Sequence, residues 1–140
     1  MKIVIVGAKD RTAASDKKDV DTLIELAAST YPDCVIVTAF AYAGIGQFVK
    51  EKCLEKDEQN QFRFQLIECS LRTYTRSLTR IEYGEVCVAM NAMLFELGDC
   101  FYHFASTDRR GTLEELITDR LIQQNRPFRV FLPGDTITVI

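Results

Sequence analysis

The chain has 140 residues, of which 47% are hydrophobic and 26% are charged, a balance typical of one folded domain and not of a disordered chain. Its net charge of -3 at pH 7 argues against a nucleic-acid-binding protein, which would present a basic surface to the phosphates. No apolar run approaches the roughly 20 residues of a membrane-spanning helix, so we expect no membrane partner.

Cysteine and histidine usage argues against the common zinc sites. Five cysteines are scattered through the chain, none in a C-x-x-C pair, and His103 is its one histidine. This pattern lacks the ligand spacing of a zinc site and is typical of reduced core thiols in a cytoplasmic protein. Met1-Lys2 leads straight into an apolar segment, without the regions of a signal peptide. We therefore expect a cytoplasmic protein with neither metal nor cofactor.

The first half of the chain predicts two strands, each followed by a helix. Lys2–Val6 and Cys34–Thr38 are apolar runs, long enough for buried strands and too short for helices. Ser15 or Asp16 is a suitable cap for the first helix, and Pro32 ends it. Apolar residues at helical spacing predict its buried face: Val20, Leu23, Ile24 and Ala27. The same spacing predicts the buried face of the second helix: Ile45, Phe48, Val49 and Cys53.

The second half predicts three more strands and two more helices. Phe62–Ile67 alternates apolar and polar residues, which favours a strand with one exposed face or at a sheet edge. Val86–Leu97 is an amphipathic helix that ends at Gly98. Asp99–Leu132 has the pattern strand, polar loop, helix, strand, which is typical of a right-handed parallel crossover. Thr136–Ile140 predicts a short strand or an arm.

Apolar strands that alternate with amphipathic helices predict a single α/β domain over residues 1–140. We expect a parallel sheet of five strands in the order 3-2-1-4-5, with helices on both faces. In such sheets ligands bind at the carboxyl ends of the strands, beside helix N-termini whose N–H groups favour anions.

Four short motifs lie at or beside the predicted strand ends or in the helix before the fourth strand. They are VGAKDR at 6–11, AGIGQ at 43–47, MNAML at 90–94 and RGTLEE at 110–115. In this layout nearly the whole chain resembles the SLOG superfamily, a group of Rossmann-like domains that includes the Lonely Guy nucleotide phosphoribohydrolases, DprA-type domains and nucleotide-sensor modules. The resemblance implies a doubly wound Rossmann-like fold, a nucleotide-derived ligand, and pairing into homo-dimers or higher homo-oligomers.

In the Lonely Guy enzymes a loop P-G-G-x-G-T-x-x-E binds phosphate and supplies a catalytic glutamate. Gly111, Thr112 and Glu115 match the end of that loop, and Ser106–Arg110 replaces its beginning. Those enzymes also use an arginine from the preceding helix, whose place falls near Met90 here. The resemblance therefore implies ligand binding more directly than it implies catalysis.

The sequence thus predicts a crevice for a nucleotide or a nucleotide-derived phosphate ligand, as in a sensor or sequestering module. Glycines, helix starts and arginines that bind phosphate through paired N–H groups would converge there. The residues expected to line it are Gly7, Lys9, Arg11, Gly44, Gly46, Arg109, Arg110, Gly111 and Thr112.

Simpler structural roles fit the same residues. Thr112 and Glu115 have the spacing of an ordinary capping box, and Asp108–Arg110 fits a solvated loop. His103, between aromatic residues in a strand, fits a core position better than a catalytic one. The arginines 72, 76 and 80 fit a solvated face, and Tyr42 and Tyr74 fit either exposed loop positions or stacking on a base.

An alternative function is that of an enzyme, a nucleoside 5′-monophosphate N-glycosidase. Cleavage of the bond between base and ribose develops positive charge at the anomeric carbon, which a carboxylate stabilises. Glu115 is the expected catalytic residue and Glu114 the second candidate. The predicted Val86–Leu97 helix also carries Val88 and Phe95 outside its main apolar stripe, an extra surface that favours a homo-oligomer.

Overall fold

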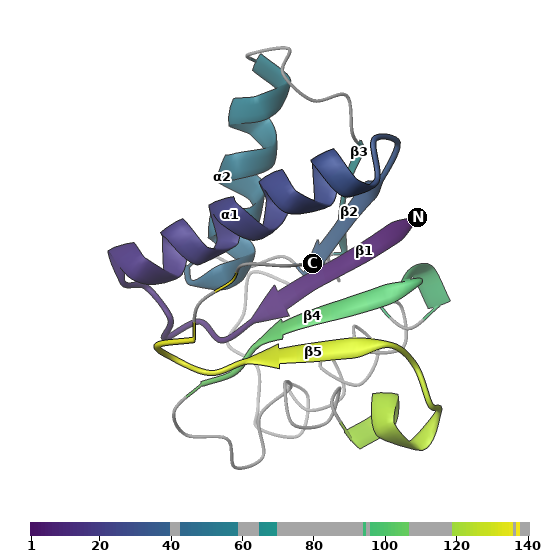
Figure 1. The fold of residues 1–140 in the computed structure, drawn as a ribbon. Helices are drawn as coiled ribbons and strands as arrows, with labels where there is room; N and C mark the ends of the chain where they lie inside the picture. Colours follow the sequence, from purple (N-terminus) through teal and green to yellow (C-terminus); the bar gives the residue numbers. More distant parts are fainter. Residues whose placement is uncertain are drawn as a thin grey trace, which may run out of the picture.

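The computed structural model describes residues 1–39, 43–58, 65–69, 94, 96–106, 119–135 and 137, and for 56–58 and 65–69 it describes the backbone alone. These residues form an α/β arrangement in which helices pack against a sheet whose neighbouring strands are all parallel (Figure 1). The predicted α/β class with a parallel sheet is therefore confirmed. None of the described helices is both long and apolar enough to cross a membrane.

The sheet runs in the order β3-β2-β1-β4-β5. The strands are β1 (Lys2–Gly7), β2 (Val35–Ala39), β3 (Gln65–Cys69), β4 (Cys100–Phe104) and β5 (Phe128–Phe131). The central strand, β1, pairs with β2 from Lys2 opposite Val35 and with β4 from Ile3 opposite Cys100. Because all the strands are parallel, the loops that follow them gather at one edge of the sheet.

Strand β3 extends two residues beyond the predicted end at Ile67, and residues 62–64 lie outside the described part of the chain. Its residues pair with β2 from Gln65 opposite Val35 to Cys69 opposite Ala39. Alternation in a sequence indicates which faces a strand presents, whereas its ends depend on the partner strand. The strand lies at an edge of the sheet, one of the two positions that the alternation favoured.

Helix α1 (Ala14–Thr30) buries the predicted face, since Val20, Leu23, Ile24 and Ala27 are all inaccessible to solvent. Its start corrects the sequence prediction, because the N-cap is Ala13 and not Ser15 or Asp16. Asp16 is instead the third helical residue, and its carboxylate accepts a hydrogen bond from the Ala13 N–H at 3.2 Å. The carboxylate thus satisfies the Ala13 N–H, a backbone donor at the helix start that would otherwise bond to water.

Helix α2 (Ile45–Glu58) packs beside α1 on the same side of the sheet (Figure 1). Ile45, Val49 and Cys53 are buried and Phe48 is partly buried against the same cluster, which confirms the predicted face. The two helices are also joined by an ion pair between Lys52 Nζ and Glu25 Oε1 at 3.1 Å, in which the lysine is buried.

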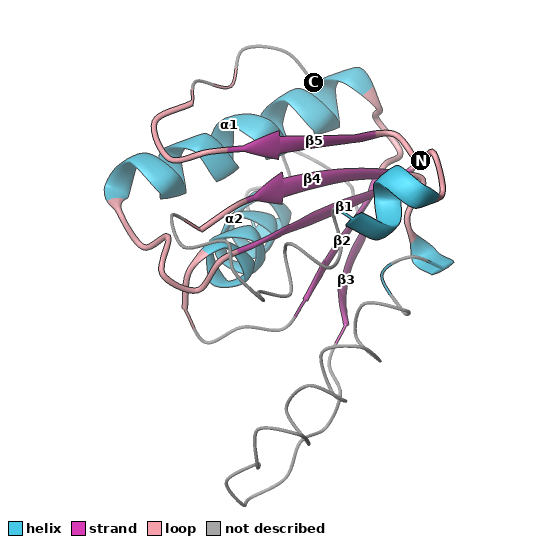
Figure 2. Cartoon of the chain, turned by 90° about the horizontal axis from the view of Figure 1, so that it is seen from below, coloured by secondary structure: helices cyan, strands magenta, loops and turns pink. Residues whose placement is uncertain are grey.

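Strand β1 contributes to a core on each face of the sheet. Ile3 and Ile5 pack with α1 and α2, and Val4 and Val6 pack on the opposite face. There they meet Leu121, one of the helical residues 119–123, which Figure 2 shows on the side of the sheet away from α1. Of the predicted arm at 136–140, Ile137 alone is described, and it is buried in the core beneath α1. Most of the predicted 86–97 helix lies outside the described residues.

Gly7 at the end of β1 is tightly enclosed by protein. A Cβ atom at this position would lie 2.7 Å from the Phe104 carbonyl oxygen and 2.6 Å from Cγ1 of Ile45. Gly134 offers the opposite situation, with φ of +91° and no atom within 4 Å of such a Cβ. The two glycines therefore separate the cost of a steric clash from the cost of a strained dihedral.

We predict that Gly7→Ala lowers the free energy of unfolding by about 2–3 kcal/mol, because the sheet must shift to admit a methyl group. Gly134→Ala is the matched control, with an expected loss of about 1 kcal/mol from its dihedral alone. Urea unfolding followed by circular dichroism measures both. Wild-type stability in Gly7→Ala would contradict the close approach of β1 to β4 and α2.

Candidate functional site

The loop that follows β1 is attached to the ends of β4 and β5 by backbone hydrogen bonds. The Ala8 N–H donates to the Phe104 carbonyl at 3.0 Å, and the Ala105 N–H donates to the Phe131 carbonyl at 3.0 Å. These bonds continue the sheet for one residue beyond the strands, so the first residues of both loops have fixed positions. The carboxyl edge of the sheet, where the sequence predicted a ligand crevice, therefore begins with an ordered wall.

Three of the predicted glycines lie along this wall. Gly44, with φ of +76°, approaches the β1 loop so closely that a Cβ would lie 2.4 Å from the Ala8 carbonyl oxygen. The Ile45 N–H at the start of α2 faces the same carbonyl at 3.4 Å. Gly7 and Gly44 therefore let the β1 loop pack against α2, and Gly46 is buried in the first turn of that helix. Their geometry is explained by contacts within the protein.

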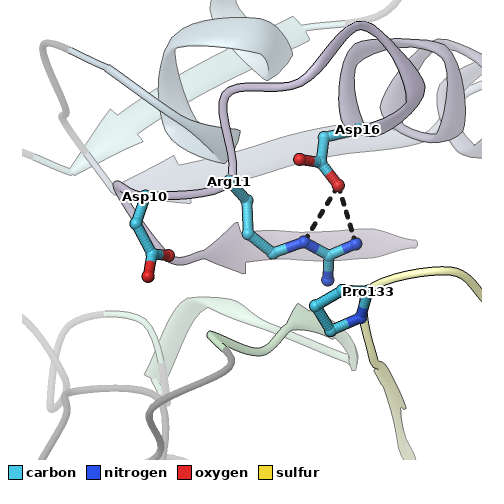
Figure 3. A pocket seen from close by; sticks show the side chains of 4 residues that line it. All are labelled: Asp10, Arg11, Asp16 and Pro133. Carbon is cyan, nitrogen blue, oxygen red and sulfur yellow. Dashed lines mark hydrogen bonds and ion pairs between the residues drawn. The ribbon is translucent and has the colours of Figure 1, made fainter.

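Arg11 occupies the centre of this edge and is only 4% exposed. Its Nε and Nη2 donate to Oδ1 of Asp16 at 3.0 and 2.9 Å (Figure 3). Its Nη1 donates to the carbonyls of Phe131 at 2.8 Å and of Ala105 at 3.3 Å. The guanidinium also lies over the Phe104 ring, 5.2 Å from its centroid. One side chain thus connects the β1 loop, α1 and the ends of β4 and β5.

The described contacts of Arg11 are made within the protein, and its predicted contact with phosphate stays a prediction. An arginine has five N–H donors, and the four hydrogen bonds of this guanidinium all reach protein acceptors. Asp16, whose carboxyl group also binds the start of α1, balances its charge. The sequence contained one signal of this role, an acidic residue in the first turn of the helix after the loop.

A pocket of about 140 Å³ opens beside this ion pair, lined by Asp10, Arg11, Asp16 and Pro133 (Figure 3). Asp10 comes from the β1 loop, and Pro133 follows β5. Oδ2 of Asp10 accepts a hydrogen bond from the buried hydroxyl of Ser106 at 2.7 Å. Asp10 and Pro133 were absent from the predicted site, because neither residue type stands out in a loop.

Acidic and basic groups both act on Asp19, which lies in α1 near the pocket. Desolvation raises the pKa of Asp19 above its usual value, and the charges of Asp16 and Asp135 raise that pKa further. Arg11 and Lys18 act in the opposite direction. The pocket itself is lined by two carboxylates, Asp10 and Asp16, and by one guanidinium, Arg11, so the formal charge of its lining is negative.

The structure brings together the predicted residues of the first two loops and leaves the others untested. Gly7, Lys9, Arg11 and Gly44 lie in or against the β1 loop, Gly46 lies in the first turn of α2, and Lys9 is exposed. The other half of the prediction lies outside the described residues: Arg109, Arg110, Gly111, Thr112, Glu114 and Glu115. The same holds for Tyr42, Tyr74 and the arginines at 72, 76 and 80.

Within the described part of the chain, two further groups occupy structural positions. His103 is 1% exposed inside β4, the core position that its aromatic neighbours favoured. The free thiol of Cys53 is also buried, and its desolvation raises its pKa to about 12. A thiol with such a pKa is almost wholly protonated at neutral pH and is a poor nucleophile. No cluster of His, Cys, Asp and Glu with the arrangement of a metal site occurs among these residues.

Comparisons of the chain with protein-family models, with curated proteins and with solved structures found no match.

Replacement of Arg11 tests its structural role. We predict that Arg11→Met lowers the free energy of unfolding by about 3–5 kcal/mol, because it leaves the buried carboxylate of Asp16 without its counter-charge. Lys17→Met is the matched control, since Lys17 pairs with Asp21 at 3.6 Å on the surface and such pairs contribute about 1 kcal/mol or less. Urea unfolding measures both variants, and equal small losses would contradict a structural role for Arg11.

Proposed function

We propose that the chain is a single Rossmann-like domain of the SLOG type that binds a nucleotide or a nucleotide-derived phosphate ligand at the carboxyl edge of its sheet. The observation that carries the proposal is that the β1 loop, the start of α1 and the segment after β5 line a pocket at that edge, and that the end of β4 and the start of α2 pack against the same loop. Parallel sheets bind ligands at this edge. A sensor or sequestering role requires no catalytic acid.

The two halves of the crevice have different roles in this proposal. The phosphate binds to Arg109, Arg110, Gly111 and Thr112, whose sequence predicts paired guanidinium donors beside a helix start. The β1 loop with Gly7, Lys9, Gly44 and Gly46 supplies the opposite wall. Arg11 acts by holding that wall in place, because its guanidinium bonds are made within the protein. We further propose that the chain forms a homo-oligomer.

A thermal-shift measurement tests the proposal. We predict that at least one of AMP, GMP, CMP, UMP, cyclic nucleotides or ADP-ribose raises the unfolding temperature by several degrees, because a ligand at 100 times its Kd stabilises the folded state by about 2.7 kcal/mol. The double variant Arg109→Ala, Arg110→Ala should lose this shift. The control Lys17→Ala, Lys18→Ala removes the same charge from α1 and should keep it. A wild-type protein stabilised by none of these compounds would contradict the proposal.

The enzymatic alternative rests on the match of Glu115 to the G-T-x-x-E motif, and one substitution separates the two functions. In an N-glycosidase, Glu115→Gln should abolish base release from nucleoside monophosphates while ligand affinity changes by only a few-fold. In a binding module the wild-type protein releases no base, and the variant loses only a helix-cap interaction of about 1 kcal/mol. We predict the second outcome, read by chromatography of the free base. Base release by the wild-type protein that Glu115→Gln abolishes would establish the enzyme.

A further inference from the structure

The pocket beside Arg11 has the wrong charge for a phosphate. The guanidinium of Arg11 is balanced by Asp16 at 2.9 Å, which leaves Asp10 as the net charge among its lining residues. Two like unit charges about 4 Å apart repel by about 4 kcal/mol near a protein surface. A phosphate group inside this pocket would therefore be repelled by the carboxylate of Asp10.

The carboxylate of Asp10 is arranged to accept hydrogen bonds. Oδ2 is fixed by the Ser106 hydroxyl at 2.7 Å, and Figure 3 shows the carboxyl group on the side of Arg11 away from Asp16. A carboxylate offers about four lone-pair sites, so one hydroxyl leaves most of its capacity unused. Asp10 is exposed to solvent, which makes that capacity accessible to a ligand.

The size of the pocket restricts what enters it. Its volume of about 140 Å³ is below the roughly 300 Å³ at which sites for whole drug-sized ligands begin. It therefore accommodates one part of a nucleotide. Among the parts of a nucleotide, the ribose is compact, uncharged and carries two neighbouring hydroxyl groups that donate hydrogen bonds.

We infer that Asp10 is a specificity-determining residue that receives the sugar hydroxyls of the ligand, and that the pocket beside Arg11 excludes the phosphate. This inference rests on the proposed function and adds an orientation to it: the ribose faces the β1 loop and the phosphate faces the opposite side of the crevice. The site consequently discriminates ribonucleotides from their deoxy forms.

Calorimetric titration tests the orientation with AMP, GMP, CMP and UMP, each beside its 2′-deoxy form, with inorganic phosphate as a third probe. The wild-type protein should bind the ribonucleotide about tenfold more tightly than the deoxynucleotide, the typical effect of one hydrogen bond to a charged group. This comparison requires no substitution, so it does not depend on the folding of a variant.

The variant Asp10→Asn keeps the shape of the side chain and an acceptor for Ser106. It should weaken ribonucleotide binding about tenfold, the effect of a lost charged hydrogen bond. Binding of the deoxynucleotide and of inorganic phosphate should change by less than about twofold, well under one such bond. Asp33→Asn, at an exposed position in the turn before β2, removes the same charge away from the pocket and should leave all affinities unchanged.

Two results would overturn the inference while leaving the proposed function intact. Tighter ribonucleotide binding by Asp10→Asn would place the phosphate in this pocket. Equal weakening of the ribonucleotide and the deoxynucleotide would mean that Asp10 does not recognise the sugar hydroxyl. A wild-type protein that binds none of the four ribonucleotides would end the proposed function and this inference together.

Discussion

The carboxyl edge of the sheet depends on the buried guanidinium of Arg11. Desolvation of an ion pair costs several kcal/mol per ion, and the attraction between its members repays that cost only when further hydrogen bonds satisfy the remaining donors. Here the Phe131 and Ala105 carbonyls accept two such bonds, beyond those made by Asp16. The pair is thus stable only where the β1 loop, the start of α1 and the ends of β4 and β5 meet, so it specifies how these four segments fit together.

In the proposed function, the Arg11–Asp16 pair determines which groups of a ligand can bind beside it. Because Asp16 neutralises Arg11, the charges that the β1 loop exposes are the ammonium group of Lys9 and the carboxylate of Asp10. The close approach of Gly44 to the Ala8 carbonyl holds the same loop against α2. In the proposed function, a ligand that enters the pocket meets the Asp10 carboxylate as an acceptor, and the paired donors for its phosphate come from another segment. The arginines, glycine and threonine of the 109–112 segment supply such groups in the proposed function.

Sequence periodicity predicted which face of a helix is buried, because that feature depends on the residues of a single element. The spacing of Val20, Leu23, Ile24 and Ala27 indicated the buried face of α1, since solvent exclusion repeats with the helix period. The start of α1 and the role of Arg11 were not predictable in this way. Ala13 is a cap because Asp16 reaches back to it, and Arg11 is buried because acceptors 94 and 120 residues away converge on it. Those contacts exist only after the sheet has formed. The ends of β3 depend similarly on its pairing with β2.

The most direct test of this account is hydrogen exchange at the Nε–H of Arg11, measured by nuclear magnetic resonance in the protein without ligand. A guanidinium bonded to Asp16, Ala105 and Phe131 should show an Nε–H that exchanges far more slowly than those of the other arginines, and slower exchange should persist at saturating AMP. This follows because opening the pair separates four packed segments. Rapid exchange in the free protein, with protection appearing only on addition of nucleotide, would contradict it and would make Arg11 a ligand-binding residue.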